Sequence, residues 1–298
     1  MRRIGILETS SADSDRLQLW ELFRQRLREL GYAEGQDISF ESRWAQGKAN
    51  LLPELAAELV RLNVDAIVTA GTPAAFAAKQ ATTTIPIVMA TGVSVDPALN
   101  ESPRGSAGNV TGLSDLAPGL SRKRLELLSQ VVPDAAHLAV LWDQTNQAGS
   151  CVVDEYQDAA RSLGLSLEVF GVSISSDFDH ALSAMIRNGA GGFIGVTSAM
   201  FFGERKRLAV LALEHRLPAM FVRREYADVG ALMAFGAPIR DNYRRAAGYV
   251  DKIFRGARPA DLPVEVPVEF ELAVNMKTAQ VLGLTIPQRV LDGAQQVE

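Results

Sequence analysis

The second half of this 298-residue chain repeats the order of strand and helix patterns found in its first half. The four matched segments, in chain order, are residues 4–7 with 138–141, 28–31 with 161–164, 66–68 with 192–194, and 85–88 with 217–220. One match alone is weak evidence, because strand–helix units resemble one another. Four matches in the same order predict two similarly built α/β lobes.

Apolar runs alternate with helix-period patterns through the first half. The predicted strands are 4–7, 38–41, 66–70 and 87–89, and the predicted helices are 15–30, 52–62 and 72–81. Such alternation is typical of a parallel sheet with helices on both faces. The fold class we predict is therefore α/β, with two Rossmann-like lobes that contain parallel sheets.

Segments without a counterpart indicate where the chain passes between the lobes. We assign residues 1–113 and 232–265 to lobe 1, and residues 114–231 and 266–298 to lobe 2, which makes a hinge of three crossings. A long helix is predicted at about 241–255. Ligands of such sheets bind beyond the carboxyl ends of the strands, so we expect the two lobes to share one ligand cleft.

Composition narrows the choice of partners. The formal net charge is −5, from 30 Lys+Arg and 35 Asp+Glu, and nucleic-acid binding needs a basic footprint, so we expect no nucleic-acid partner. The one cysteine, Cys151, permits no internal disulfide.

No apolar run reaches the ~18 residues of a spanning helix. The run at 4–7 is also shorter than the about 7–15 residues of a secretory leader, so we expect a cytoplasmic protein or one whose leader has been removed.

Sequence signatures of catalysis are missing. There is no phosphate-binding loop and no G-x-S-x-G elbow, and the three histidines, His137, His180 and His215, are far apart. We therefore expect binding, with no catalytic residue, metal or cofactor. Two alternatives stay open: an enzyme acting on small acids, with Asp143 and Glu225 as its only acid–base candidates, and a ligand-sensing domain with the same two-lobed cleft.

Motifs spread along the chain carry a family resemblance. They are residues 81–88, 96–97, 108–112, 123–128, 230–233, 256–265 and 275–287. In this order they resemble the signature of the ABC transporter substrate-binding family, which has the type I periplasmic-binding fold. The resemblance covers essentially the whole chain. It implies a monomeric receptor that delivers a small molecule to a membrane permease from the periplasm or another extracytoplasmic compartment. Aromatic amino acids or related carboxylates are the implied ligands, and hinge closure is the expected mechanism.

Residues that directly follow the predicted strands are the candidates for binding the ligand. Small polar side chains at such positions can hydrogen-bond a small molecule. The candidates are Thr9, Ser10, Trp44, Thr72, Thr91 and Gly92 in lobe 1, and Trp142, Asp143, Asn146, Thr197, Ser198, Phe201, Glu225 and Tyr226 in lobe 2.

Thr72 is the leading candidate. Gly71 permits close approach of the backbone, and Pro73 suits the first turn of a helix. Amides at that helix start would favour a ligand carboxylate by ~0.3–1 kcal/mol. The other interpretation is that Thr72 caps the helix, and the two roles are compatible.

Charged and aromatic candidates each have two interpretations. Glu225 can pair with a ligand ammonium, or the adjacent Arg223 and Arg224 can neutralise it. Trp142 and Phe201 can hold an aromatic ring between them, or Phe201 can belong to the core. Burying ~150 Å² of ring at ~25 cal/mol/Å² contributes roughly 4 kcal/mol before entropic costs.

Overall fold

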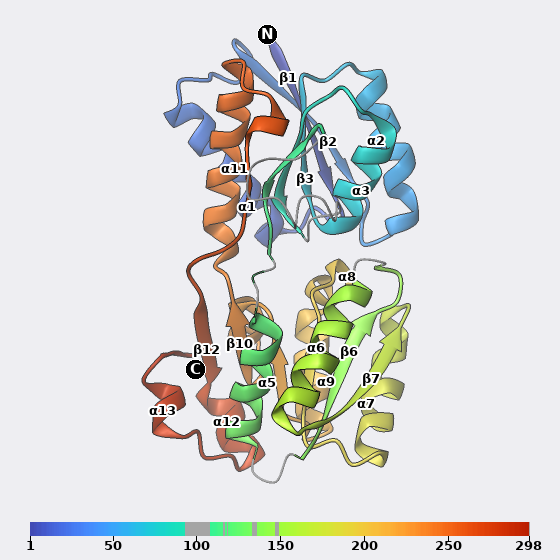
Figure 1. Ribbon diagram of the computed structural model, residues 1–298, viewed down its shortest axis with the longest axis vertical. Helices are drawn as coiled ribbons and strands as arrows, with labels where there is room; N and C mark the ends of the chain where they lie inside the picture. The colour runs from blue at the N-terminus through green and yellow to red at the C-terminus, as the bar shows by residue number, and fades with distance from the viewer. Residues whose placement is uncertain (93–107, 116, 118, 133–135, 147–148, 298) are drawn as a thin grey trace. The chain divides into compact units, whose positions relative to one another are not determined.

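The computed structural model describes residues 1–92, 108–115, 117, 119–132, 136–146 and 149–297 (Figure 1). Its chain forms two compact units. Unit 1 comprises Met1–Ala117 and Ile239–Pro267, and unit 2 comprises Pro118–Pro238 and Val268–Glu298. The chain therefore passes between the units three times. The motif at 96–97 lies outside the described residues.

Unit 1 is built on a six-stranded sheet in the order β11-β5-β4-β3-β1-β2, with every pair parallel. The strands are β1 Arg2–Glu8, β2 Ile38–Trp44, β3 Ala66–Ala70, β4 Ile87–Thr91, β5 Val110–Leu113 and β11 Val264–Glu265. The helices are α1 Ser14–Glu29, α2 Leu52–Arg61, α3 Thr72–Ala81 and α11 Ile239–Phe254, with short 3-10 turns at Ala49–Leu51 and Pro259–Asp261. In register, Ile6 of β1 pairs with Ser42 of β2 and Val68 of β3.

Helices cover both faces of this sheet (Figure 1). On one face, Ile4 and Ile6 of β1 pack against α1 and α11, where Trp20 meets Tyr243 edge-on at 5.0 Å. On the other face, Leu7 packs against α2 and α3. Strands that are buried on both faces need apolar side chains at successive positions, which explains the unbroken apolar runs in the sequence.

Unit 2 is built on a seven-stranded sheet in the order β13-β12-β10-β9-β8-β6-β7. Only β12 runs antiparallel to its neighbour β10, and the other pairs are parallel. The strands are β6 His137–Asp143, β7 Ser166–Val172, β8 Phe193–Gly195, β9 Ala219–Phe221, β10 Met233–Gly236, β12 Glu271–Asn275 and β13 Ala294–Val297.

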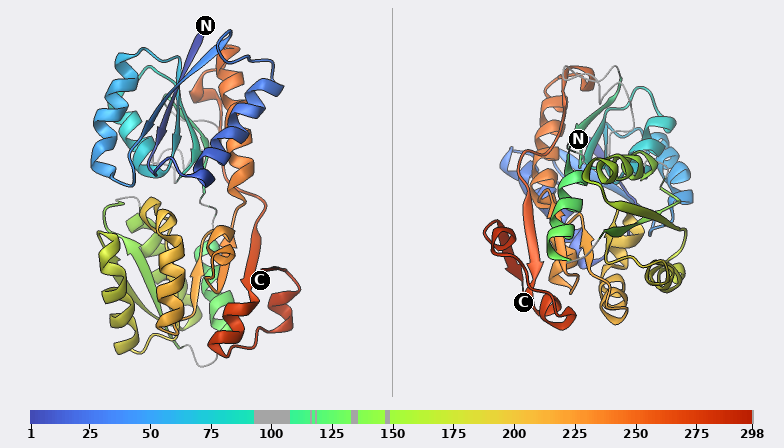
Figure 2. Two further views of the ribbon diagram at one scale, coloured as in Figure 1. Left: turned by 180° about the vertical axis from the view of Figure 1, so that it is seen from behind. Right: turned by 60° about the horizontal axis from the view of Figure 1, so that its bottom comes forward.

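Eight described helices accompany this second sheet. They are α5 Leu120–Val131, α6 Gly149–Leu163, α7 Phe178–Arg187, α8 Ala199–Gly203, α9 Arg205–Glu214, α10 Arg224–Asp228, α12 Met276–Leu282 and α13 Gln288–Leu291, with a 3-10 turn at Ser175–Asp177. Figure 2 shows α12 and α13, in red, beside β12 at the edge of unit 2 where the chain ends. The core under α7 to α10 is aromatic, and the rings of Phe221 and Tyr226 stack at 4.2 Å.

The predicted fold class is confirmed, since both units are α/β with mainly parallel sheets. The predicted boundary at residues 231 and 232 is wrong. The apolar run there forms β10, which pairs with β9 and β12 inside unit 2, so the chain crosses only after Pro238. Burial between two neighbouring strands explains why this run is apolar. Among the described residues, none of the helices combines the length and the apolar character needed to span a membrane.

Candidate functional site

Small polar residues gather at the carboxyl edge of the unit 1 sheet. Thr9 and Ser10 follow β1, Thr72 follows β3 after one glycine, and Thr91 is the last residue of β4. All four are buried. The Thr9 hydroxyl donates to the carbonyl oxygen of Ala70 at 2.9 Å and so links the ends of β1 and β3. These four residues therefore contribute neutral hydroxyl and amide groups to this edge.

A buried carboxylate behind this edge holds Ser10. Glu8, the last residue of β1, is 1% exposed and accepts from the Ser10 amide and the Trp20 indole N–H, each at 3.0 Å. The Ser10 Oγ is buried and finds no hydrogen-bond partner among the described residues. The Glu8 carboxylate thus holds the backbone of Ser10 in place.

Arg16 completes the network around Glu8. Its guanidinium donates to the Tyr243 hydroxyl at 3.3 Å. Burial by itself lowers the pKa of Arg16, but the Glu8 carboxylate, Tyr243 and Asp13 outweigh burial and raise the pKa above its usual value. The positive charge on Arg16 is therefore secure, and the Glu8–Arg16 pair belongs to the interior of unit 1.

Two glycines bring backbone segments close together at this edge. Gly71 has φ 94°, and a Cβ on it would lie 2.7 Å from Thr9 Oγ1. Gly92 has φ 132°, and a Cβ on it would lie 3.0 Å from the Thr72 nitrogen. Side chains are disfavoured at both positions by φ and by space. The prediction that Thr72 caps α3 is wrong, because Gly71 occupies the cap position and Thr72 is the first helical residue.

Asp143 organises the carboxyl edge of the unit 2 sheet. It ends β6, and its Oδ1 accepts from the Thr145 amide at 2.9 Å and the Thr145 hydroxyl at 2.6 Å. Its Oδ2 accepts from the Ser198 hydroxyl at 2.6 Å. Ser198 in turn accepts from the amide of Met200 and so caps α8. A carboxylate has about four acceptor positions, and groups in the described part of the chain use three of them.

Asn146 joins the same group. Its backbone N–H donates to the backbone carbonyl of Asp143 at 3.1 Å, and its side-chain Nδ2 donates to the backbone carbonyl of Thr197 at 3.4 Å. Its Oδ1 is buried and has no hydrogen-bond partner within the described part of the chain. The structure therefore brings together four residues that the sequence predicted separately, at the ends of two adjacent strands.

Two aromatic candidates lie in the core of unit 2 and not at its edge. Phe201 has no exposed surface and packs edge-on against Phe178 at 5.5 Å. Tyr226 is 1% exposed and stacks on Phe221. The interpretation of Phe201 as a core residue is therefore the correct one, because α8 turns its apolar face toward the sheet. Trp142 is half-buried and keeps exposed surface.

Trp44 pairs in register with Glu8 at the carboxyl edge of the unit 1 sheet, and Glu225 lies on the helix that follows β9. Trp44 ends β2 and lines, with Trp20, Leu17 and Arg24, a cavity of about 150 Å³ between α1 and the edge of the sheet. Glu225 is half-buried in α10. Its neighbour Arg224 forms an ion pair with Asp228 at 3.3 Å.

Sequence reasoning missed Arg124, which is buried on α5. Its Nε donates to the Phe235 carbonyl at 2.8 Å and its Nη1 to the Tyr156 hydroxyl at 3.1 Å. Arg124 thereby places a cation beside the end of β10. A usable signal existed, because Arg124 stands at helical spacing from Leu120 and Leu128 on the apolar face of its helix.

Asp115 was also missed. It accepts from the Gly92 amide at 3.2 Å and from Asn242 Nδ2 at 3.4 Å, and so connects the ends of β4 and β5 to α11. Elsewhere in the described ranges, no group of three or more His, Cys, Asp or Glu side chains is placed to hold a metal ion.

Two parallel-stranded α/β units joined by three crossings define the type I periplasmic-binding class of proteins. The chain matches the family described as "ABC transporter substrate binding protein" over residues 3–298, and it belongs to that family. It is thus a non-enzymatic substrate-binding protein of an ABC transporter, and the family resemblance of its motifs is confirmed.

Relatives of known structure or ligand agree with this class. A tyrosine-binding protein of Clostridioides difficile is 27% identical over 268 residues, 88% of this chain and 75% of that protein. The ABC domain from Streptococcus pneumoniae in complex with L-Trp is 25% identical, with a TM-score of 0.90 over 100% of this chain and 99% of that one. A conserved domain protein from Vibrio cholerae gives 25% identity and a TM-score of 0.89 over the same shares.

Proposed function

We propose that this protein captures an aromatic amino acid, with the carboxyl edges of both sheets contributing to the site. The observation that carries the proposal is the Asp143 carboxylate, which is buried and accepts three hydrogen bonds, so that one acceptor position is unused by the residues that the structure describes. A buried carboxylate of this kind is suited to an ammonium group. Relatives whose ligands are tyrosine and L-Trp support the ligand class.

Unit 1 is suited to the ligand carboxylate. Thr9, Ser10, Thr72 and Thr91 at its edge are neutral, and the Ser10 hydroxyl is a donor without a partner among the described residues. The start of α3 at Thr72 lies at the same edge, and a helix start favours an anion by ~0.3–1 kcal/mol. In this proposal unit 1 binds the carboxylate through neutral donors, and Asp143 of unit 2 binds the ammonium.

The ring of the ligand supplies most of the affinity. Trp142, at the end of β6 and half-buried, is the candidate for stacking. Burial of ~150 Å² of ring contributes roughly 4 kcal/mol at ~25 cal/mol/Å² before entropic costs. Asp143 and Ser10 then decide the orientation of the ligand, and Asp143 also contributes to the strength of binding through a buried charge pair.

Hinge closure at the three crossings completes the proposal. Rotation of the two units about the crossings traps the ligand and excludes water. A monomer then presents both units to the permease, from an extracytoplasmic compartment as is usual for the family. Small-angle scattering should show compaction on saturation with ligand, and an unchanged radius of gyration contradicts closure.

Calorimetric titration with L-tyrosine, L-tryptophan and L-phenylalanine tests the ligand assignment, after unfolding and refolding to remove any co-purified ligand. Asp143→Asn should weaken binding by about 30-fold or more, because truncating one partner of a buried charge pair costs about 2–5 kcal/mol. The matched control is Asp179→Asn, since Asp179 is an exposed carboxylate of unit 2 that pairs with His215 at 2.8 Å. If the wild-type protein binds none of the three, or the Asp143 variant binds like the control, the proposal fails.

A further inference from the structure

The unit 1 ends of all three crossings are connected to one residue, Glu265, through its backbone and its side chain. The first crossing follows Ala117, the second precedes Ile239, and the third follows Pro267. Glu265 lies just before the third. Its backbone carbonyl accepts from the Ser114 amide at 2.9 Å, and Ser114 lies just before the first. The side chain of Glu265 contacts α11, which begins directly after the second.

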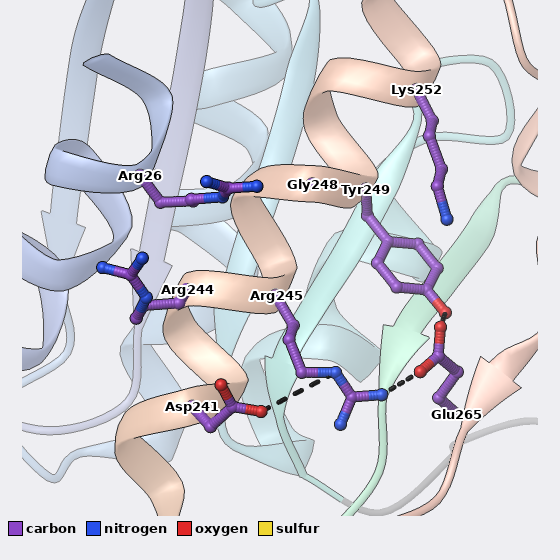
Figure 3. A pocket seen from close by; sticks show the side chains of 8 residues that line it. All are labelled: Arg26, Asp241, Arg244, Arg245, Gly248, Tyr249, Lys252 and Glu265. Atoms are coloured by element: carbon purple, nitrogen blue, oxygen red, sulfur yellow. Dashed lines mark hydrogen bonds and ion pairs between the residues drawn. The ribbon is translucent and has the colours of Figure 1, made fainter. Parts of the chain in front are cut away.

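The contacts of the Glu265 carboxylate with α11 are polar and specific (Figure 3). Oε2 accepts from Nη2 of Arg245 in an ion pair. The Tyr249 hydroxyl lies 2.6 Å from Oε1 and 2.8 Å from the Pro263 carbonyl oxygen, so its one proton bonds one of two acceptors. Glu265 also pairs in register with Leu113 as part of the β11–β5 ladder.

Burial makes these contacts persistent. The Tyr249 side chain is buried, and burial raises its pKa to about 12 while Arg245 lowers it, so the hydroxyl stays a donor at neutral pH. Arg245 and Glu265 are 33% and 36% exposed at the edge of an open groove of about 470 Å³. Their ion pair is therefore partly screened, and the Tyr249 bond anchors it on the buried side.

We propose that Glu265 is a positioning residue for ligand capture, which joins the unit 1 ends of the three crossings into one rigid anchor. The proposal rests on the proposed hinge closure. With the anchor intact, closure bends the crossings without disturbing unit 1. Without the side-chain bonds to α11, the second crossing moves separately from the other two. The ligand-free protein then samples more arrangements, and the closing step must order more of the chain.

Glu29 provides the matched control. It also accepts hydrogen bonds from two arginines of the same groove, Arg26 at 3.0 Å and Arg244 at 3.0 Å. It lies on α1, however, far in sequence from each crossing. Glu29→Gln and Glu265→Gln each remove one negative charge that pairs with an arginine of this groove, and only the second removes a bond made by a residue next to a crossing.

A distance measurement between the units tests the anchor without any ligand. Spin labels are attached to the exposed Cys151 of unit 2 and to Gln80→Cys, an exposed position of α3 in unit 1. In the ligand-free protein, Glu265→Gln should broaden the distance distribution, whereas Glu29→Gln should leave it as in the wild type. Affinity for L-tyrosine or L-tryptophan should fall about two- to fivefold, as expected for a partly exposed ion pair.

Two further variants test the same contacts from the side of α11. Tyr249→Phe and Arg245→Gln each remove one partner of Glu265, and circular dichroism checks that the variants are folded. Equal distributions for the wild type and all folded Glu265, Tyr249 and Arg245 variants overturn the anchor, even if aromatic amino acids bind. A broadened distribution supports the anchor even if the wild type binds none of them, because this readout needs no ligand.

Discussion

Glu8 in unit 1 and Asp143 in unit 2 are both buried carboxylates, and each is the last residue of its strand. The partners of Glu8 include Trp20 and Arg16, which belong to the helix layer under the sheet. The side-chain partners of Asp143 are hydroxyls of residues that follow strands, Thr145 and Ser198. Both carboxylates are buried, so burial does not distinguish them, and the position of their partners does. This difference supports the proposal that Glu8 stabilises the fold and Asp143 binds the ligand.

The internal repeat explains how this difference arose. When residues 4–7 are aligned with 138–141, Thr9 falls opposite Asp143, and Glu8 falls opposite Trp142. The carboxylate has therefore moved by one position between the two units. Successive side chains of a strand point to opposite faces, so one position is enough to change which layer a carboxylate meets.

The largest expected effect is a loss of stability when Glu8 is replaced, which Asp143, the carboxylate proposed to bind the ligand, should not show. Glu8→Ala should destabilise unit 1 by about 3–5 kcal/mol, because it leaves the buried charge of Arg16 without its carboxylate. Urea unfolding measures this in a Trp142→Phe background, where the remaining tryptophans, Trp20 and Trp44, both report on unit 1. Asp143→Asn, by contrast, should leave the urea midpoint of unit 1 unchanged and should change ligand binding. An unaltered midpoint for Glu8→Ala would break the comparison.

A second prediction concerns unit 1 at alkaline pH. The pKa of Tyr249 is raised by burial from 10.0 to about 12, so folding favours the protonated phenol. The contribution of Tyr249 to the free energy of unfolding is complete below pH 10 and is lost as the pH rises through 12. The free energy of unfolding then decreases by roughly 2–3 kcal/mol. Unfolding of unit 1 by urea at a series of pH values above about 9 measures it.

Tyr249→Phe should flatten that decline. Tyr32 remains in the variant. Its pKa is raised mainly by burial and also by its bond to Asp251, so Tyr32 still contributes a smaller loss of stability at alkaline pH. A slope unchanged by Tyr249→Phe contradicts the prediction.

The smallest effect is expected in unit 2. Burial, assisted by the Glu225 and Asp228 carboxylates, raises the pKa of Glu271, and Arg224 opposes them. The folded state therefore favours the protonated acid, and this contribution is present below the ordinary pKa of 4.5 and lost as the pH rises through the raised value. Glu271→Gln should thus stabilise unit 2 slightly at neutral pH, with the gain vanishing in acid.

Hydrogen exchange of the β10 and β12 amides measures this gain locally. The neighbouring Glu269, which is exposed, gives the control Glu269→Gln. Equal protection in the two variants at neutral pH contradicts the assignment.

Much of the fold follows from local sequence patterns. Strand 66–70 and helix 72–81 coincide with β3 and α3, because apolar runs, glycines and prolines act within a few residues of where they stand. The same patterns placed Asp143, Asn146 and Ser198 at strand ends. Parallel strands bring such ends together, so the grouping of these three residues could be predicted without coordinates.

Other features depend on contacts between distant parts of the chain. Residues 233–236 belong to unit 2 because β9 and β12 pair with them, and β12 is antiparallel. Phe201 is in the core, and Glu265 meets all three crossing segments, for the same kind of reason. The sequence by itself determined the two α/β lobes and the chemistry at their strand ends, since periodicity is local. Only the tertiary structure decided which strands pair, which side chains are buried and which carboxylate remains available, because each of these depends on partners far away along the chain.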